Sequence, residues 1–370
     1  MPIPLSRILQ ALLTALVLIA GLGAARADVT VTDILGREVT LPAPARHIVL
    51  GEARHLTVLG LIHDDPVALV SGWRQARALD APTLAAYRRK FPAIDQIVPV
   101  GAGNRGISAE AIIALHPDLV VLTLVDQNDG ATQIAARQIE AAGIPIAYVD
   151  FFSHPQENSI PSLRILGKLT GAETRAEEFA QFYETRLNRI RSRLADPGIA
   201  RPRVFFHVHA APTGCCATVG NGVFHDFITT AGGQNIGAET VGTMQGNVSL
   251  EYLIGADPDF YVATGGTHMA QRGGLVLGSG VDAETAQASF QTMIAAPGFS
   301  ALRAVREGRA AGIWHMFNDS PAHIALIEYL AKSFHPDLFA DVDPDATMAQ
   351  INARFSPVTV PGIWWVTPAR

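Results

Sequence analysis

The feature that most constrains this chain of 370 residues is a segment that occurs twice. Residues 107–123 and 248–264 align without a gap at an offset of 141, and Ser, Glu, Ile, Pro, Asp, Val and Thr coincide. Each copy reads as a serine that begins a short helix, a glutamate in its first turn, a Pro-Asp stop and a buried strand. Because this unit occurs twice, we expect two lobes with the same arrangement of helix and strand.

The longest periodic helix of the sequence lies between the two copies, at residues 173–196. Its apolar face is formed by side chains that recur every three, four or seven positions, namely Ala176, Phe179, Ala180, Tyr183, Leu187, Ile190 and Leu194. Thr170 with Glu173, or Thr174 with Glu177, can form a capping box at its start. At 1.5 Å per residue the helix spans roughly 35 Å, so we expect it to link the two lobes like a strut.

Residues 1–27 have the pattern of a secretory signal peptide, with Arg7, an apolar run over 8–23 and an Ala-Arg-Ala end. The alternative is a retained anchor, although the apolar run falls short of the ~20 residues that a span needs. Removal of Arg7 and Arg26 takes the formal charge from −6 to −8. This charge points to neither nucleic acid nor an anionic membrane surface as partner. We expect a periplasmic protein.

Beyond residue 28, apolar strands alternate with helical patterns, and 48% hydrophobic residues supply enough material for two cores. The alternation predicts an α/β fold with mostly parallel sheets. We expect a first lobe over residues 28–172 and a second lobe over 197–370. The predicted strands are 47–50, 67–71, 97–100, 119–123, 146–150, 203–209, 259–264 and 311–314, and a small hairpin surrounds Gly36.

Charged and aromatic side chains follow the predicted strands of the first lobe, where α/β proteins bind ligands. They are Glu52, Arg54, His55, Trp73, Arg74 and Arg105. Arginine grips carboxylates through paired hydrogen bonds, so the three arginines favour an anionic ligand that carries carboxylates. Each arginine is alternatively a solvated surface residue, and Trp73 either stacks on a flat ligand or packs between loops.

Four histidines follow the predicted strands of the second lobe, namely His207, His209, His268 and His315. His207 and His209 are two residues apart on a predicted strand, which places them on the same face. Imidazole suits transition metals, so His207, His209 and His315 are candidate metal ligands, while a histidine taken singly is more often structural.

The only two cysteines, Cys215 and Cys216, are adjacent. An oxidising periplasm favours a disulfide between them, and free thiols that bind a soft metal are the alternative.

Residues 101–106 spell a G-x-G-x-x-G dinucleotide fingerprint, with Asp126 twenty residues on. The next helix starts only after Ser108 and is short, so its N-terminus is poorly placed to hold a pyrophosphate. Neither G-x-S-x-G, H-E-x-x-H nor C-x-x-C occurs. We therefore expect a protein that is not an enzyme.

Several stretches carry a family resemblance, in family order: TDILGREVTLPAPARHIVLG, SAEAIIALHPDLVVL, IPIAYVD, TVGNGVFHDFITTAGGQNIG, VSLEYLIGADPDFYVATG and EGRAAGIWHMFNDSP. Through them nearly the whole mature chain resembles the substrate-binding proteins of ABC importers for iron-siderophore, haem and cobalamin complexes. The resemblance implies two Rossmann-like lobes joined by a single long helix, the class III architecture of periplasmic binding proteins. It also implies a ligand held in the cleft between the lobes. Because a single helix joins the lobes, we expect a closing motion on the order of a few Å or less.

The resemblance further implies that a glutamate on each lobe docks onto arginines of an inner-membrane permease that works with a cytoplasmic ATPase. By position these glutamates are Glu110 and Glu251; alternatively each only favours the positive end of its helix. The expected ligand is a ferric siderophore, more specifically one of carboxylate type. A haem or cobalamin carrier is the main alternative, and a direct metal-ion binder is the next. We expect a monomer without a cofactor of its own.

Overall fold

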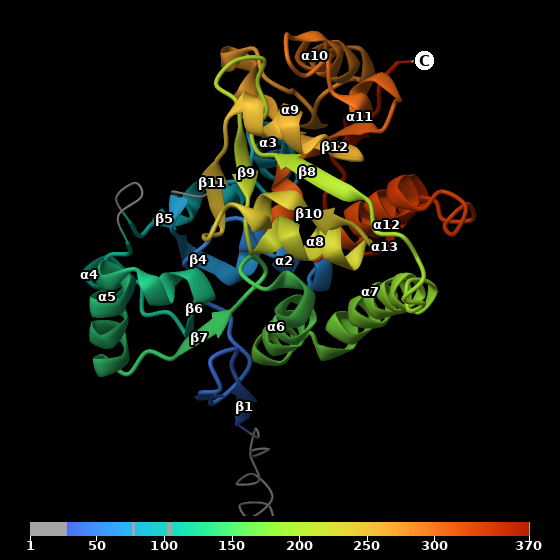
Figure 1. Cartoon of the computed structure of the whole chain (residues 1–370). Coiled ribbons are helices and arrows are strands. Elements are labelled where there is room, and N and C mark those ends of the chain that lie inside the picture. The colour runs from blue at the N-terminus through green and yellow to red at the C-terminus, as the bar shows by residue number, and fades with distance from the viewer. Residues whose placement is uncertain (1–27, 76–77, 102–105, 370) are drawn as a thin grey trace, which may run out of the picture.

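The computed structural model describes residues 28–75, 78–101 and 106–369, which form two large β-sheets with helices around each and two smaller, two-stranded sheets (Figure 1). Strands of one sheet come from residues 48–149 and strands of the other from residues 203–366. The predicted α/β fold with two lobes is confirmed. We keep residues 28–172 and 197–370 as the working definition of the first and second lobes; the predicted signal peptide lies outside the described residues.

A five-stranded parallel sheet forms the centre of the first lobe, in the order β5-β4-β3-β6-β7. Its strands are β3 (Ile48–Leu50), β4 (Val70–Trp73), β5 (Val98–Pro99), β6 (Leu119–Thr123) and β7 (Ile146–Val149). Every residue of β3, β6 and β7 is buried, as expected for parallel strands covered on both faces. The strand predicted over 67–71 begins only at Val70, because Pro66 starts a 3-10 turn, η1 (Val67–Leu69), in front of it.

Helices cover both faces of this sheet (Figure 1). They are α2 (His55–Ile62), α3 (Ala81–Lys90), α4 (Ala109–Ala114), α5 (Gly130–Ala141) and α6 (Pro155–Thr170), with 3-10 turns η3 (Pro92–Gln96) and η4 (Leu124–Asn128). The predicted hairpin is present as β1 (Val29–Thr32) and β2 (Glu38–Leu41), and Gly36 turns with a φ of +78° that favours glycine.

The second lobe is built on a mixed sheet in which β8, β12 and β14 run parallel. The seven strands are β8 (Arg203–His207), β9 (Ala217–Val219), β10 (Gln234–Asn235), β11 (Gln245–Asn247), β12 (Phe260–Gly265), β14 (Ala310–Trp314) and β16 (Trp365–Val366). A separate pair is formed by β13 (Gly278–Ser279) and β15 (Gly362–Ile363). The apolar C-terminal segment thus adds the antiparallel edge strand β16, which is too short for the sequence pattern to predict.

The helices of the second lobe pack around this sheet (Figure 1). They are α8 (Val223–Thr230), α9 (Leu250–Ala256), α10 (Ala283–Ala295), α11 (Arg303–Arg306), α12 (His323–Phe334) and α13 (Pro344–Arg354), with 3-10 turns η5 (Ile236–Glu239), η6 (Thr267–Arg272) and η7 (His315–Asp319). The repeated unit is α4 with β6 and α9 with β12. Its serines cap as predicted, since Ser108 accepts a hydrogen bond from the Ala111 N–H and Ser249 from the Tyr252 N–H.

The linking helix α7 (Glu173–Arg193) lies against α6 and α2 on one side and α12 on the other (Figure 1). All seven residues of its predicted apolar face are buried. Polar contacts also join it to the second lobe: the Tyr183 hydroxyl lies 2.8 Å from His323 Nε2, and Arg189 pairs with the buried Glu328. The helix is therefore part of the core of both lobes.

The start of α7 differs from the prediction. Ala172 is its N-cap and no side chain caps it, so neither proposed capping box forms. Thr170 instead belongs to the last turn of α6, where its hydroxyl donates to the Leu166 carbonyl. Gly171 then ends α6 with a left-handed φ of 70°, which places α7 against α6 after a very short turn.

Truncation of the α7 core should destabilise the whole protein. Phe179 is fully buried and its ring packs edge-to-face on Phe355 at 5.0 Å, so we expect Phe179→Ala to lower the free energy of unfolding by about 3–5 kcal/mol. Thr185→Ala, at an exposed position of the same helix, should change it by less than about 0.5 kcal/mol. Urea denaturation followed by circular dichroism measures both; equal effects of the two variants would contradict the shared core.

Candidate functional site at the interlobe cleft

A cavity of about 130 Å³ lies between the lobes, beside the ends of the parallel strands. The first lobe lines it with Arg54, Leu61 and Tyr87, and the second with Trp314, Phe317 and Met348, among others. Most of its walls are therefore apolar and aromatic. Ligand pockets for drug-sized molecules measure roughly 300–1,000 Å³, so the cavity as it stands is too small for a siderophore complex.

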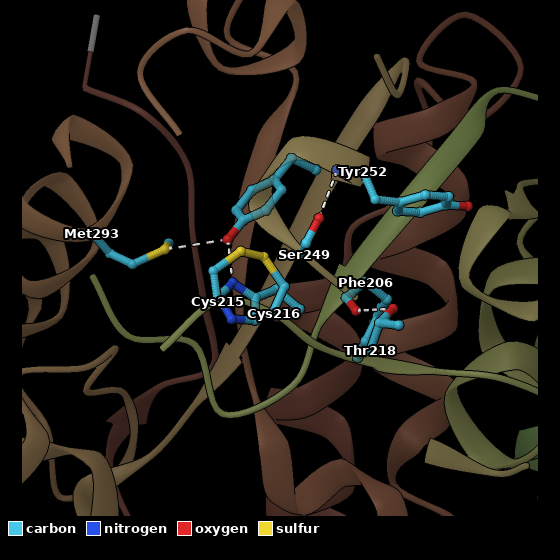
Figure 2. Close-up of a disulfide and its surroundings, with 9 residues drawn as sticks. Phe206, Cys215, Cys216, Thr218, Ser249, Tyr252 and Met293 are labelled. Atoms are coloured by element: carbon cyan, nitrogen blue, oxygen red, sulfur yellow. Dashed lines mark hydrogen bonds between the residues drawn. A yellow bond between two sulfur atoms is a disulfide. The ribbon is translucent and has the colours of Figure 1, made fainter. Parts of the chain in front are cut away.

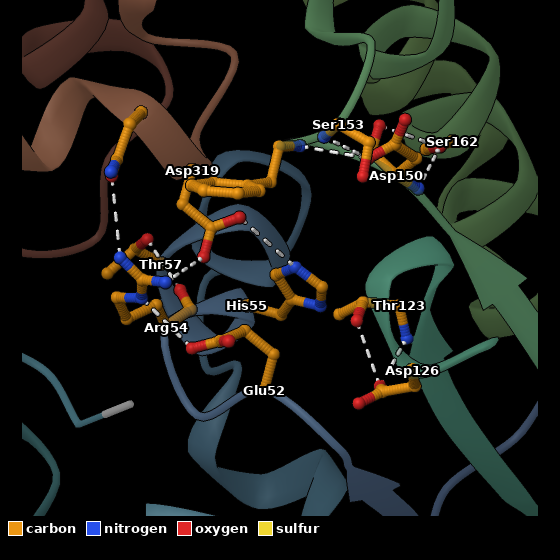
Figure 3. A network of polar contacts seen from close by, with 12 residues as sticks. Glu52, Arg54, His55, Thr57, Thr123, Asp126, Asp150, Ser153, Ser162 and Asp319 are labelled. Atoms are coloured by element: carbon orange, nitrogen blue, oxygen red, sulfur yellow. Dashed lines mark hydrogen bonds and ion pairs between the residues drawn. The ribbon is translucent and has the colours of Figure 1, made fainter. Parts of the chain in front are cut away.

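Arg54 stands at the wall of this cavity and joins the two lobes. Its Nε donates to Glu52 Oε1 at 2.9 Å within the first lobe. Its Nη2 lies 2.9 Å from Asp319 Oδ2, and its Nη1 donates to Asn318 Oδ1 at 3.4 Å, both on η7 of the second lobe. All three guanidinium nitrogens of this buried arginine are thus engaged, two of them across the cleft (Figure 3).

His55 lies deeper in the same network. Its side chain is buried, packs edge-to-face on Phe151 at 5.2 Å, and places Nε2 3.7 Å from Asp319 Oδ1. Figure 3 shows Asp319 lying between Arg54 and His55. Burial, followed by the charge of Asp319, raises the pKa of Glu52. The predicted group of Glu52, Arg54 and His55 does meet at the cleft, but the group also includes an aspartate of the second lobe.

The other candidates of the first lobe are not free to grip a ligand in this arrangement. Trp73 is buried in the hydrophobic core, which favours the packing alternative over stacking on a ligand. Arg74 forms a buried ion pair with Asp126, with Nη2 and Oδ1 2.7 Å apart. Arg105, together with most of the G-x-G-x-x-G segment, lies outside the described residues.

Three of the four predicted histidines meet at the end of the second sheet. The rings of His209 and His315 are 3.9 Å apart between centroids, and those of His209 and His268 are 4.9 Å apart. His268 Nε2 lies 2.9 Å from His209 Nδ1. His315 is held by Thr264 at Nδ1 and by Asn318 at Nε2. We call His209, His268 and His315 the histidine cluster.

Burial is the first cause of the lowered pKa values in the histidine cluster. Burial, then His268 and Arg272, lowers the pKa of His209 to about 4. Burial lowers the pKa of His315 well below its usual value, with further effects of His209, His268 and Arg54; burial and Arg272 lower that of His268. Arg272 is therefore a cation near His209 and His268, whereas Arg54 is already paired with Glu52 and Asp319.

His207 does not join the cluster, so the prediction that His207 and His209 lie on the same face is wrong. It is buried in the core, with Nδ1 2.6 Å from the Tyr261 hydroxyl and its ring stacked on Phe299 at 5.5 Å. Strand β8 ends at His207, and His209 has a positive φ of 49°. The alternation that would place both rings on one face is broken at this turn.

The described residues 28–75, 78–101 and 106–369 contain no group of three or more His, Cys, Asp or Glu side chains arranged to hold a metal ion. The candidate metal set of His207, His209 and His315 is therefore not assembled.

No helix in the described part of the chain is long and apolar enough to cross a membrane.

Cys215 and Cys216 form a disulfide in the loop that follows the histidine at the end of β8 (Figure 2). Cys216 exchanges two backbone hydrogen bonds with Val248, of 2.9 and 3.0 Å. Val248 directly precedes Ser249, the N-cap of α9. The disulfide loop therefore lies between the cluster and the helix that carries Glu251.

Glu110 and Glu251 both lie exposed in the first turns of α4 and α9. Hydrogen bonds from its own backbone N–H and from Ser249 lower the pKa of Glu251. These contacts fit the favourable position of an acid at a helix N-terminus, and they leave both side chains accessible.

Two residues of the site were missed from the sequence. Asp319 stands in the FNDSP motif, four residues after His315, and pairs with Arg54. Arg272 lies four residues after His268, and no strand ends there to mark it. Both residues lie at the ends of 3-10 turns that follow parallel strands. All residues of these turns, and not only the first ones, are therefore candidates for the site.

The structure is a two-lobed α/β protein with a cavity lined by both lobes. The model of the periplasmic binding protein family matches residues 48–313, and the chain belongs to this family. A TroA-like periplasmic binding protein, FepB from Veillonella parvula, superposes with a TM-score of 0.85 at 26% identity, over 92% of this chain and 100% of that one. A molybdate-binding protein, MolA from Haemophilus influenzae, shares the fold at 17% identity with a TM-score of 0.66, over 90% of this chain and 99% of that one.

Two curated relatives bind corrinoids by name. The vitamin B12-binding protein of Salmonella paratyphi A is 30% identical over 163 residues, 44% of this chain and 56% of the relative. The cobalamin-binding protein of Halobacterium salinarum is 26% identical over 205 residues, 54% of this chain and 52% of the relative. The chain thus matches just over half the length of these relatives.

Stability should fall in mild acid because of the buried His207. Burial lowers its pKa from 6.5 to about 4, so between these values the unfolded chain binds a proton that the folded protein refuses. The stabilising contribution is complete above pH 6.5 and is lost as the pH falls towards 4. Melting temperatures measured from pH 8 to pH 4 should decline less steeply for His207→Gln. Equal slopes for wild type and His207→Gln would contradict this assignment.

Proposed function

We propose that this protein is the substrate-binding component of an ABC importer and that it captures an anionic metal chelate, a ferric siderophore of carboxylate type, in the interlobe cleft. The observation that carries the proposal is the arrangement at the mouth of the cleft, where the histidine cluster is joined through Asn318 to Arg54 and lies near Arg272. Arg272 is exposed and affects both His209 and His268. A cation beside a partly buried mouth attracts anionic ligands and raises their association rate.

Neutral imidazoles in this mouth supply a second kind of contact. Both ring nitrogens of His315 are engaged by Thr264 and Asn318. His209 and His268 contact each other through His209 Nδ1 and His268 Nε2. Their other ring nitrogens, His209 Nε2 and His268 Nδ1, form no hydrogen bond within the described residues. Such nitrogens suit an open coordination position of a chelated transition metal. No chemistry on the ligand is part of this proposal.

A cobalamin carrier is the second candidate, and the names of the curated relatives favour it. A corrinoid offers an axial position to one imidazole, as haem does. It does not need a cation such as Arg272 beside the cluster, which is why we place it second.

Titration of the pure protein against ferric citrate, haemin and cobalamin tests the ligand class. We expect ferric citrate to quench tryptophan fluorescence, because Trp314 and Trp364 line the cavity. Arg272→Glu should weaken this binding roughly tenfold, since charge reversal replaces an attraction of about 0.7 kcal/mol by a repulsion of similar size. The matched reversal Arg306→Glu, on α11, should have no effect. Tight binding of cobalamin without binding of ferric citrate would favour the second candidate instead.

We propose that Glu110 and Glu251 dock the loaded protein onto the permease. Support comes from their accessibility at equivalent positions of the repeated unit. Two other exposed glutamates, Glu173 on α7 and Glu284 on α10, also occupy first turns of helices, so they experience the same helix dipole without belonging to the repeat.

Charge reversal at the two docking positions should abolish uptake. We expect the double variant Glu110→Lys/Glu251→Lys to lose transport in reconstituted vesicles that hold the permease and ATPase, while its ligand affinity stays within about twofold of wild type. The double variant Glu173→Lys/Glu284→Lys is the matched control and should transport normally. Equal loss of transport in both variants, or loss of ligand affinity in the first, would refute the docking assignment.

A further inference from the structure

The Arg54–Asp319 ion pair is the polar contact that most directly opposes opening of the cleft. Arg54 is the N-cap of α2 in the first lobe, and Asp319 ends η7 in the second. The side chains are 13% and 3% exposed, so the pair is almost fully withdrawn from water. Asn318 adds a second contact from the same turn to the same guanidinium. Separation of the lobes has to break both.

A ligand of the proposed class cannot enter without this separation. The cavity of about 130 Å³ is smaller than the pockets of roughly 300–1,000 Å³ that hold drug-sized ligands. Arg54 lines the cavity together with Asp319. Asn318 also connects the pair to the histidine cluster, because its amide nitrogen lies 3.2 Å from His315 Nε2. The ion pair therefore stands at the junction between cavity and cluster.

The planar fork of arginine is suited to carboxylates: Glu52 of the first lobe accepts from Nε, and Asp319 of the second lobe lies 2.9 Å from Nη2. When the lobes separate, Glu52 stays with Nε, but Nη1 and Nη2 lose Asn318 and Asp319, and the loss of a buried charge partner is unfavourable when nothing replaces it. A ligand carboxylate would restore the same kind of contact once Asp319 has moved away with the second lobe. We propose that Asp319 is an internal substitute for an anionic group of the ligand: it occupies Arg54 while the cleft is empty and is displaced when the ligand binds.

This inference rests on the proposed function for the identity of the displacing group, a carboxylate of the ferric chelate. It assigns a specificity role to Asp319 that differs from that of a structural ion pair. A structural pair would only lower stability when removed. A competing internal anion also lowers the apparent affinity for the ligand, because part of the binding energy is spent on displacing it.

The test compares ferric citrate binding to wild type, Asp319→Asn and Asp257→Asn by tryptophan quenching. Asp257 forms an ion pair with Arg303 within the second lobe, with Oδ2 and Nε 2.9 Å apart, and is the matched control. We expect Asp319→Asn to bind about tenfold more tightly than wild type, and Asp257→Asn to bind like wild type. Equal or weaker binding by a folded Asp319→Asn, or by Asp319→Ser as the second variant, would overturn the inference.

A measurement without ligand separates this inference from the proposed function. Spin labels on Ile134→Cys of α5 and Ile254→Cys of α9, both at exposed positions, report the distance between the lobes. In the empty protein, Asp319→Asn should shift this distance distribution to longer values, and Asp257→Asn should not. An unchanged distribution would refute the substitute role even if ferric citrate binds. A shifted distance distribution without ferric citrate binding would support the substitute role of Asp319 and refute the proposed ligand.

Discussion

The structure depends on the buried face of α7, which two lobes share. Phe179, Tyr183 and Ile190 are fully or almost fully buried, and the helix packs on α2 and α6 of the first lobe as well as on α12 of the second. A wide hinge motion would expose this apolar surface, at roughly 25 cal/mol per Å². The lobes are therefore held nearly fixed where both pack on α7. Relative motion of the lobes is expected mainly where they meet through polar contacts, at Arg54, Asp319 and Asn318.

At that side the contacts are few and specific. Arg54 reaches Asp319 and Asn318, and the Thr83 hydroxyl donates to Ser279 at 3.0 Å. Directly beside them lies the histidine cluster, because Asn318 also contacts His315, and Arg272 is a charged neighbour of His209 and His268. Apolar walls, a charged junction and a group of imidazoles thus lie close together, and this combination fits the chelated, anionic metal that we propose as the ligand.

Local sequence patterns predicted the architecture well, because hydrophobic periodicity and helix capping depend on residues that are close together in the sequence. The repeat located Ser108 and Ser249 as N-caps, and all seven residues of the predicted apolar face of α7 are buried, although the period did not mark the buried Phe182. The residues of the candidate functional site were harder to predict. Strand alternation failed for His207 because the chain turns at His209, and Asp319 and Arg272 became visible only once separate turns were brought together. Contacts between distant segments leave no periodic trace in a sequence.

A crystal structure of the protein with ferric citrate tests the central claim most directly. We expect a carboxylate of the ligand on the Arg54 guanidinium, Asp319 withdrawn from it, and the iron on the side of His209 and His268. An intact Arg54–Asp319 pair with the ligand bound elsewhere, or an unoccupied cleft at saturating ligand, would contradict the account.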